Sequence, residues 1–179
     1  MKASKKEIVE IVGIFGVIAS LVFVGMQLML DRKVALAEQY FDRGESAKAD
    51  RRAILESDDL MRYYEERWAL GERPSFWNED WEIARQVEEG TISVRSLIAT
   101  YVNDQLAIIG FDSVYFQYQQ GLIEEEMWNE LRTGMKRSMA SDELTRAIFQ
   151  SRARTTIRPV VEELIREIES ERDSADQDE

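Results

Sequence analysis

The sequence has 179 residues, with 23 Lys and Arg against 35 Asp and Glu, and it contains neither His nor Cys. These absences exclude Ser-His-Asp and Cys-His catalysis, disulfides, Cys/His zinc sites, haem held by His or Cys, and the Glu-x-x-His di-iron bundle. The length suits one modest domain with an appended segment. We therefore expect a non-enzymatic protein without a cofactor.

The net charge of −12 is not spread evenly along the chain. Five of the basic residues but only three of the acidic residues precede Val34, so the remainder is strongly acidic. Such a surface repels nucleic acid and anionic lipid headgroups, and nucleic acid is excluded as an expected partner.

An uncharged apolar run over residues 11–30 follows a short basic tail over residues 1–10. About 20 apolar residues in a helix cross ~30 Å of hydrocarbon, and a helix satisfies its own backbone hydrogen bonds there. The alternative is a signal peptide cleaved near residues 35–37. Because signal h-regions usually span only ~7–15 residues, we expect an uncleaved transmembrane helix in contact with the lipid bilayer.

The orientation of this helix is not determined by its flanking charges. The positive-inside rule compares the Lys and Arg residues that lie near the two ends of the span. Three lie on each side: Lys2, Lys5 and Lys6 before the span, and Arg32, Lys33 and Arg43 after it.

One stripe of the span has small and polar residues at alternating spacings of three and four. Small residues let two helix backbones approach closely in lipid, and Ser or Gln can form a hydrogen bond across the contact. We therefore predict packing against another transmembrane helix, from a second copy or a partner, with a lone anchor as the alternative. The packing stripe consists of Gly13, Gly16, Ser20, Phe23 and Gln27.

The rest of the chain has helical patterns with clear ends and no persistent strand-like alternation. We expect an all-α fold, in which the transmembrane helix continues into a juxtamembrane stalk over residues 31–56, with Gly44 as a kink or break. A bundle of about five or six helices follows over residues 57–172, and then a disordered acidic tail over residues 173–179. The expected bundle helices cover residues 57–70, 76–89, 92–120, 124–139, 141–152 and a last segment that begins near residue 157.

The segment over residues 92–120 is apolar on two faces, which predicts a central helix buried between its neighbours. Its ends are marked by the preceding Gly90 and by Gly121. The expected core stripe consists of Ile98, Val102, Leu106, Ile109 and Phe116.

Candidate chemistry along the chain is sparse. Asp104 and Asp112 share one face of the central helix but lie ~12 Å apart along it, too far for one metal ion, so a solvated edge or pairing with Arg from a neighbouring helix is favoured. The basic pair Arg51 and Arg52 is expected to form salt bridges with nearby acids. The tryptophans are expected in the core or at an interface, with an aromatic ligand cage as the alternative: Trp68, Trp77, Trp81 and Trp128.

Two segments support a resemblance. EIVGIFGVIASLVFVGMQL, followed by a basic flank and a stalk rich in Ala, Glu and Gln, resembles the anchor of an uncharacterised family of small bacterial single-pass membrane proteins with a C-terminal helical domain. FQYQQGLIEEEMWNEL, over residues 116–131, is similar to their second signature, in which a Gly-Leu turn joins an aromatic-rich helix to an acidic helix start. The resemblance implies the bacterial inner (cytoplasmic) membrane, with the domain in the cytoplasm, and it implies no activity.

These observations favour an accessory, assembly or scaffolding subunit of a membrane protein complex. It would act through transmembrane-helix packing and through its helical domain. One alternative is a membrane-tethered sensor, which requires a sizeable apolar pocket beside the central helix to bind a small ligand. Another is a homo-oligomeric channel-like assembly lined by Ser20 and Gln27.

Overall fold

The N-terminal helix α1 is continuous over Lys5–Glu56 in the computed structural model, which describes residues 5–177. Within those residues the chain forms seven helices and no strand, which confirms the expected all-α class. The chain divides into two compact units, Met1–Gln39 and Tyr40–Glu179. The second unit is called the helical domain below, and it contains the C-terminal part of α1.

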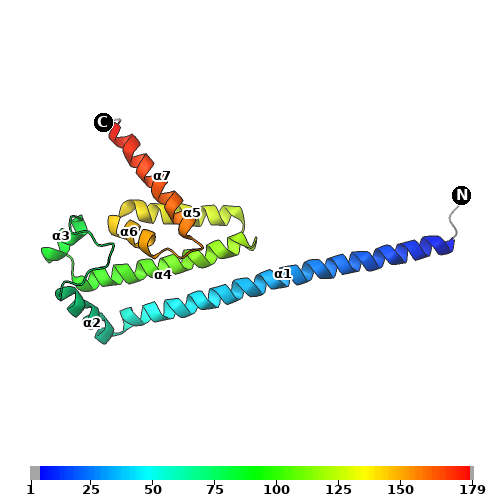
Figure 1. Cartoon of the computed structure of the whole chain (residues 1–179), viewed down its shortest axis with the longest axis horizontal. Coiled ribbons are helices and arrows are strands. Elements are labelled where there is room, and N and C mark those ends of the chain that lie inside the picture. Colours follow the sequence, from blue (N-terminus) through cyan, green and yellow to red (C-terminus); the bar gives the residue numbers. More distant parts are fainter. Residues whose placement is uncertain (1–4, 178–179) are drawn as a thin grey trace. The chain divides into compact units, whose positions relative to one another are not determined.

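Six further helices follow α1 in the helical domain. Within it, α4 is the central helix and packs against α2, α5 and α6, while α7 packs against α5 and α6 (Figure 1). The bounds are α2 Asp58–Ala69, α3 Glu82–Glu88, α4 Val94–Gln119, α5 Glu125–Ser141, α6 Glu143–Arg152 and α7 Arg158–Gln177.

The helix starts follow from side chains that satisfy free backbone N–H groups. The Ser57 hydroxyl accepts a hydrogen bond from the backbone N–H of Leu60, at 3.3 Å, and begins α2. The Asp142 carboxylate accepts from the N–H groups of Leu144 and Thr145, at 3.3 and 2.8 Å, and begins α6. These caps compensate for donors that the first helical turn leaves unpaired.

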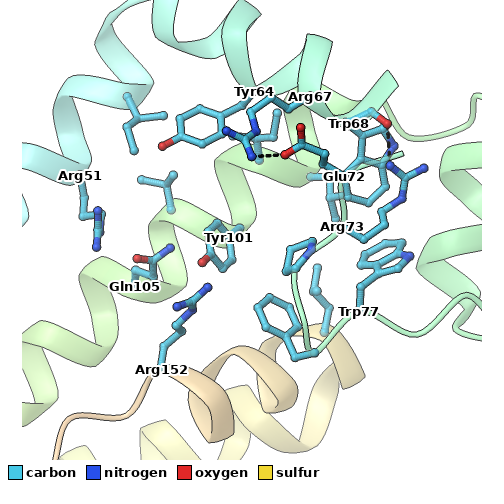
Figure 2. A pocket seen from close by; sticks show the side chains of 17 residues that line it. Arg51, Tyr64, Arg67, Trp68, Glu72, Arg73, Trp77, Tyr101, Gln105 and Arg152 are labelled. Atoms are coloured by element: carbon cyan, nitrogen blue, oxygen red, sulfur yellow. Dashed lines mark hydrogen bonds and ion pairs between the residues drawn. The ribbon is translucent and has the colours of Figure 1, made fainter. Parts of the chain in front are cut away.

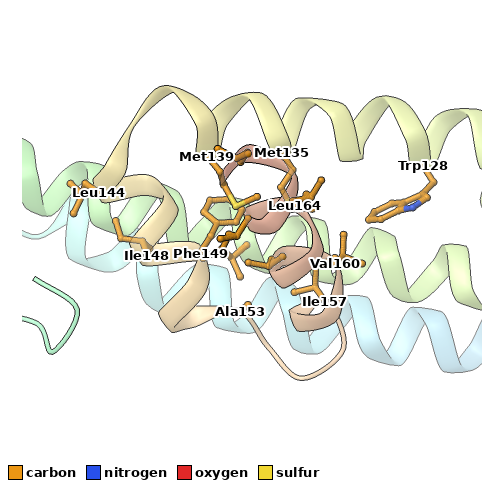
Figure 3. Close-up of a cluster of buried hydrophobic side chains, with 14 of the residues drawn as sticks. Trp128, Met135, Met139, Leu144, Ile148, Phe149, Ala153, Ile157, Val160 and Leu164 are labelled. Atoms are coloured by element: carbon orange, nitrogen blue, oxygen red, sulfur yellow. The ribbon is translucent and has the colours of Figure 1, made fainter. Parts of the chain in front are cut away.

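Most of the buried apolar surface lies in one cluster, which we call the large cluster (Figure 3). Fully burying a Leu, Ile, Phe or Met side chain contributes about 1.5–3 kcal/mol, so this cluster makes the larger hydrophobic contribution of the two buried clusters in the domain. Its members come from α4 to α7 and the α6–α7 loop: Leu97, Ile108, Trp128, Met135, Met139, Leu144, Ile148, Phe149, Ala153, Ile157, Val160, Val161, Leu164, Ile165 and Ile168.

A second group of buried side chains, the small cluster, joins α1, α2 and α4. It consists of Ile54, Met61, Ile98 and Val102. Two residues of the expected core stripe, Ile98 and Val102, therefore lie here. Of the other three, Ile109 is buried, while Leu106 and Phe116 are half-buried.

The structure differs from the expected stalk boundary at residue 56. The compact helical domain begins at Tyr40, because the C-terminal part of α1 packs onto α4 rather than standing apart as a stalk. Gly44 neither kinks nor breaks α1. A Cβ atom at Gly44 would lie 2.8 Å from the Ser113 hydroxyl oxygen, so the glycine allows α1 to approach α4 closely.

Two other expected helix bounds are also revised. The helix expected over residues 76–89 is only α3, Glu82–Glu88, because the Asn78 side chain accepts from the backbone N–H of Asp80, at 3.0 Å, in a local turn that competes with helix. The acidic tail is helical to Gln177, and residues 178–179 lie outside the described part. Near the C-terminal part of α7, Arg172 donates to the Ala140 carbonyl oxygen, at 3.2 Å, and fixes α7 to α5.

Candidate functional site

The apolar part of α1 has no covering side chains in the structure. This helix is long and apolar enough to cross a membrane, and none of its apolar window is buried. All five residues of the packing stripe are exposed, and nothing lies within 4 Å of the positions that Cβ atoms would take at Gly13 and Gly16. The Ser20 hydroxyl donates to the Gly16 carbonyl oxygen of its own helix, at 2.8 Å, so its own donor is already satisfied.

The helical domain contains a cavity of about 440 Å³ beside α4, which we call the pocket (Figure 2). Side chains from α1, α2, the α2–α3 loop, α4 and α6 line it, so the pocket lies wholly within one compact unit. The size falls within the ~300–1,000 Å³ range of small-molecule sites.

The α2–α3 loop forms the aromatic end of the pocket. Trp68 and Trp77 meet edge to face, with ring centroids 4.8 Å apart, and Phe76 stacks on Tyr101 at 5.8 Å. This loop can turn back onto α2 because Gly71 adopts a positive φ of 84° directly after the helix. The turn therefore places the aromatic side chains of the loop against α4.

Two arginines at this aromatic end already have partners. The Arg73 guanidinium lies 3.8 Å above the Trp68 ring and donates to the Trp68 carbonyl oxygen, at 2.6 Å. Arg67 pairs with the Glu72 carboxylate and donates to the Tyr63 hydroxyl, at 2.6 Å. Because Arg73 already covers the Trp68 face, that face is not free as part of a cage for a cationic ligand.

The other end of the pocket is polar. Arg51 of α1 and Arg152 of α6 form no ion pair or hydrogen bond with another residue of the described chain. The Arg152 guanidinium lies over two aromatic rings, 5.9 Å from the centre of Phe76 and 5.8 Å from the centre of Tyr101. Gln105 is only 9 % exposed and makes no hydrogen bond within residues 5–177, but its amide atoms are not among the buried atoms without a partner, so the amide opens into the pocket. In Figure 2 the Arg51 and Arg152 guanidinium groups lie on either side of the Gln105 amide, and the Tyr101 hydroxyl points to the same end.

A buried polar cluster connects α1 to α4 and to the α6–α7 loop. Asp112 is fully buried, accepts a hydrogen bond from the Tyr40 hydroxyl at 2.7 Å, and lies 3.6 Å from the Arg154 guanidinium. The Tyr40 hydroxyl also lies 2.9 Å from the Thr156 hydroxyl, and the Tyr40 ring stacks on Phe116 at 4.1 Å. Burial raises the pKa of the Tyr40 hydroxyl above its ordinary value of 10.0.

The two aspartates that share a face of α4 therefore have different surroundings. Asp112 is not on a solvated edge; it pairs with Arg154, which is the other arrangement that the sequence favoured. Asp104 is half-buried and accepts from the Thr145 hydroxyl, at 3.0 Å, and burial raises the pKa of its carboxyl group. Within the described residues no group of three or more acidic side chains is placed to hold a metal ion.

No local sequence pattern predicted the residues at the polar end of the pocket. Both members of the Arg51–Arg52 pair were expected to form salt bridges, whereas only Arg52 lies near an acid, 3.9 Å from the Glu45 carboxylate. The available signal was the helical spacing: Arg51 falls three residues before the buried Ile54, on the side of α1 that faces α4. Of the four tryptophans, Trp128 is buried in the large cluster, and Trp68 and Trp77 line the pocket.

No protein-family model matches this chain, and no similar protein is found among curated proteins or among solved structures.

Proposed function

We propose that this chain is a non-enzymatic, single-pass protein of the bacterial inner membrane. In this proposal it acts as an accessory, assembly or scaffolding subunit of a membrane protein complex. The observation that supports it most is the apolar part of α1, none of which is buried among the described residues. A helix of this length and composition is stable when lipid, or another transmembrane helix, surrounds it.

The packing stripe supplies the proposed contact with a neighbouring helix. Gly13 and Gly16 leave open space beside the backbone, and the Ser20 and Gln27 side chains offer polar groups on the same stripe. In lipid, association of helices depends on close backbone approach and on interhelical hydrogen bonds rather than on burial from water. The acidic helical domain would then contact the soluble part of the partner.

The test is site-directed crosslinking in native membranes, combined with purification in mild detergent. We expect Gly16→Leu and Ser20→Leu to reduce the yield of crosslinked product severalfold, because each places a bulky side chain in the contact. Val22→Leu is the matched control, since it lies two residues and therefore about 200° from Ser20 around the helix. Unchanged crosslinking in both stripe variants, or extraction of the intact chain by alkaline carbonate, would contradict the proposal.

The pocket favours a second function, that of a membrane-tethered sensor for a small ligand. α1 contributes Arg51 and Ile54 to the lining, so a bound ligand would contact the same helix that carries the apolar run. We expect a ligand in the pocket to slow amide hydrogen exchange in α1 around these two residues. Exchange that is equally fast with and without a saturating ligand would contradict the sensor function and leave the subunit function intact.

A further inference from the structure

We propose that the pocket binds an organic carboxylate with an aromatic or acyl body. The carboxylate would lie between Arg51, Arg152 and the Gln105 amide, and the apolar body would lie against the aromatic end of the pocket. This inference deepens the sensor function and rests on it, but it does not depend on the subunit function or on the packing stripe.

The charge of the polar end selects for an anion. Arg51 and Arg152 have no acidic partner within the described chain, although the protein as a whole carries a net charge of −12. Most other arginines of the helical domain pair with the abundant acids, as Arg132 does with Glu163 at 2.9 Å. Two unpaired guanidinium groups beside one cavity therefore form a local positive site, and guanidinium groups bind carboxylates by paired, charge-assisted hydrogen bonds.

Gln105 adds a polar group at the same end of the pocket. Its side chain is nine-tenths buried on α4, lines the pocket, and has no hydrogen-bond partner among the described residues. Its amide atoms are not among the buried atoms without a partner, so they open into the pocket, where a ligand can reach them. A carboxylate between the two arginines would accept a hydrogen bond from the Gln105 amide nitrogen, and the Tyr101 hydroxyl points to the same end (Figure 2).

The remaining lining determines the body of the ligand. Phe76 and Trp77 present aromatic surface, and Ile98 and Val102 present aliphatic surface, without a further unpaired charge at that end. Flat rings and acyl chains both fit such a lining. Two sources share this chemistry: a soluble aromatic acid, and a fatty acid released from membrane lipid.

The test measures binding calorimetrically, with the full-length protein in lipid nanodiscs and with empty nanodiscs subtracted. The probes are naphthalene-2-carboxylate for the aromatic source and decanoate for the acyl source. Each is compared with its neutral carboxamide. We expect at least one carboxylate to bind about tenfold or more tightly than its carboxamide, since a charge-assisted hydrogen bond exceeds a neutral one by that order. The carboxylate that binds more tightly identifies the source.

Variants then locate the site. Arg51→Gln and Arg152→Gln are each expected to weaken carboxylate binding about tenfold, while Arg62→Gln, an exposed arginine of α2 outside the pocket, is the matched control and leaves it unchanged. Gln105→Leu is expected to weaken binding and to leave the melting temperature nearly unchanged, because the amide that it removes already opens into the pocket and makes no hydrogen bond within the described chain. A structural role for Gln105 would instead lower the melting temperature.

The proposal is overturned if neither carboxylate binds at about 1 mM, the weakest affinity of interest for this site. It is also overturned if each carboxylate and its carboxamide bind equally, or if both arginine variants bind like the wild type while near-ultraviolet circular dichroism shows them folded. If no carboxylate binds but crosslinking depends on the packing stripe, the proposed ligand is rejected and the subunit function is kept. If a carboxylate binds but crosslinking does not depend on the packing stripe, only the subunit function is rejected.

Discussion

The central helix α4 meets two differently packed regions of the helical domain. In one direction lies the large cluster, with fifteen buried apolar residues among those described, and in the other lies the small cluster, with four. The pocket borders both clusters, because Ile54, Ile98 and Val102 of the small cluster and Leu97 and Leu144 of the large cluster line it. The comparison indicates that apolar burial is concentrated in the large cluster, and that the cavity lies where the side chains around the small cluster leave space unfilled.

The most direct test of this comparison truncates one methionine on each side. Met139 in the large cluster is completely buried, and Met61 in the small cluster is 5 % exposed. We expect Met139→Ala to lower the free energy of unfolding by about 4 kcal/mol and Met61→Ala by about 2 kcal/mol, since a tightly packed site relaxes less around a new cavity. Urea unfolding in detergent, followed by circular dichroism, measures both. Equal losses would remove the distinction between the two regions.

Enlarging a side chain should again destabilise the large cluster more than the small cluster. Ile148 is fully buried in the large cluster, whereas Ile98 borders the pocket. Overpacking a filled core costs about 1–3 kcal/mol, so Ile148→Phe is expected to destabilise by that amount. Ile98→Phe can extend into the pocket, and we expect a loss below about 1 kcal/mol. A larger loss for Ile98→Phe than for Ile148→Phe in the same unfolding assay would show that the pocket is closed in solution.

Two glycines test the close approach of α1 to α4. Replacing an exposed helix glycine by alanine usually stabilises by about 0.5–1 kcal/mol, and Gly134 of α5 has nothing within 4 Å to prevent this gain. At Gly44 the new methyl group would meet the Ser113 hydroxyl, so Gly44→Ala is expected to destabilise by about 1 kcal/mol. Ser113→Ala in the same chain should recover part of the loss. A gain for Gly44→Ala alone would mean that α1 does not pack closely there.

The smallest expected effect concerns the Tyr40 hydroxyl. Tyr40→Phe keeps the ring stacked on Phe116 and removes the hydrogen bond to Asp112, with an expected loss of about 0.5–1.5 kcal/mol at neutral pH.

This effect depends on pH in a defined direction. Because the folded state raises the pKa of Tyr40, the neutral phenol stabilises the fold below pH 10.0, and that contribution is lost as the pH rises through the folded-state pKa. The stability difference between wild type and Tyr40→Phe should therefore shrink above about pH 10. A difference that stays constant to pH 11.5 in urea titrations would argue that the hydroxyl is not buried.

The sequence was sufficient to predict the features that depend on local signals. The helices expected over residues 57–70 and 141–152 begin within two residues of α2 and α6, and Gly121 marks the end of the central helix as expected, because caps and positive φ values act within a few residues. The apolar run of α1 was likewise readable from composition alone.

The features that depend on tertiary contacts were not predictable in this way. Gly44 resembled a weak point in a stalk until the Ser113 side chain was seen beside it. The helix expected to begin near Phe76 is shorter, since Asn78 forms a local turn and Trp77 packs on Trp68. The pocket exists because side chains from five segments leave part of the space between them unfilled. The residue spacing within any one of these segments does not predict such a cavity.

The edge-to-face pair of Trp68 and Trp77 has one further consequence. Trp81 extends it, with its ring 5.8 Å from Trp77, so three indoles lie close together between the end of α2 and the start of α3, and Trp68 and Trp77 line the pocket. Indole transitions at such separations couple excitonically, which makes the loop a built-in optical reporter. Small reorientations of these rings would appear as changes in rotational strength without any added label.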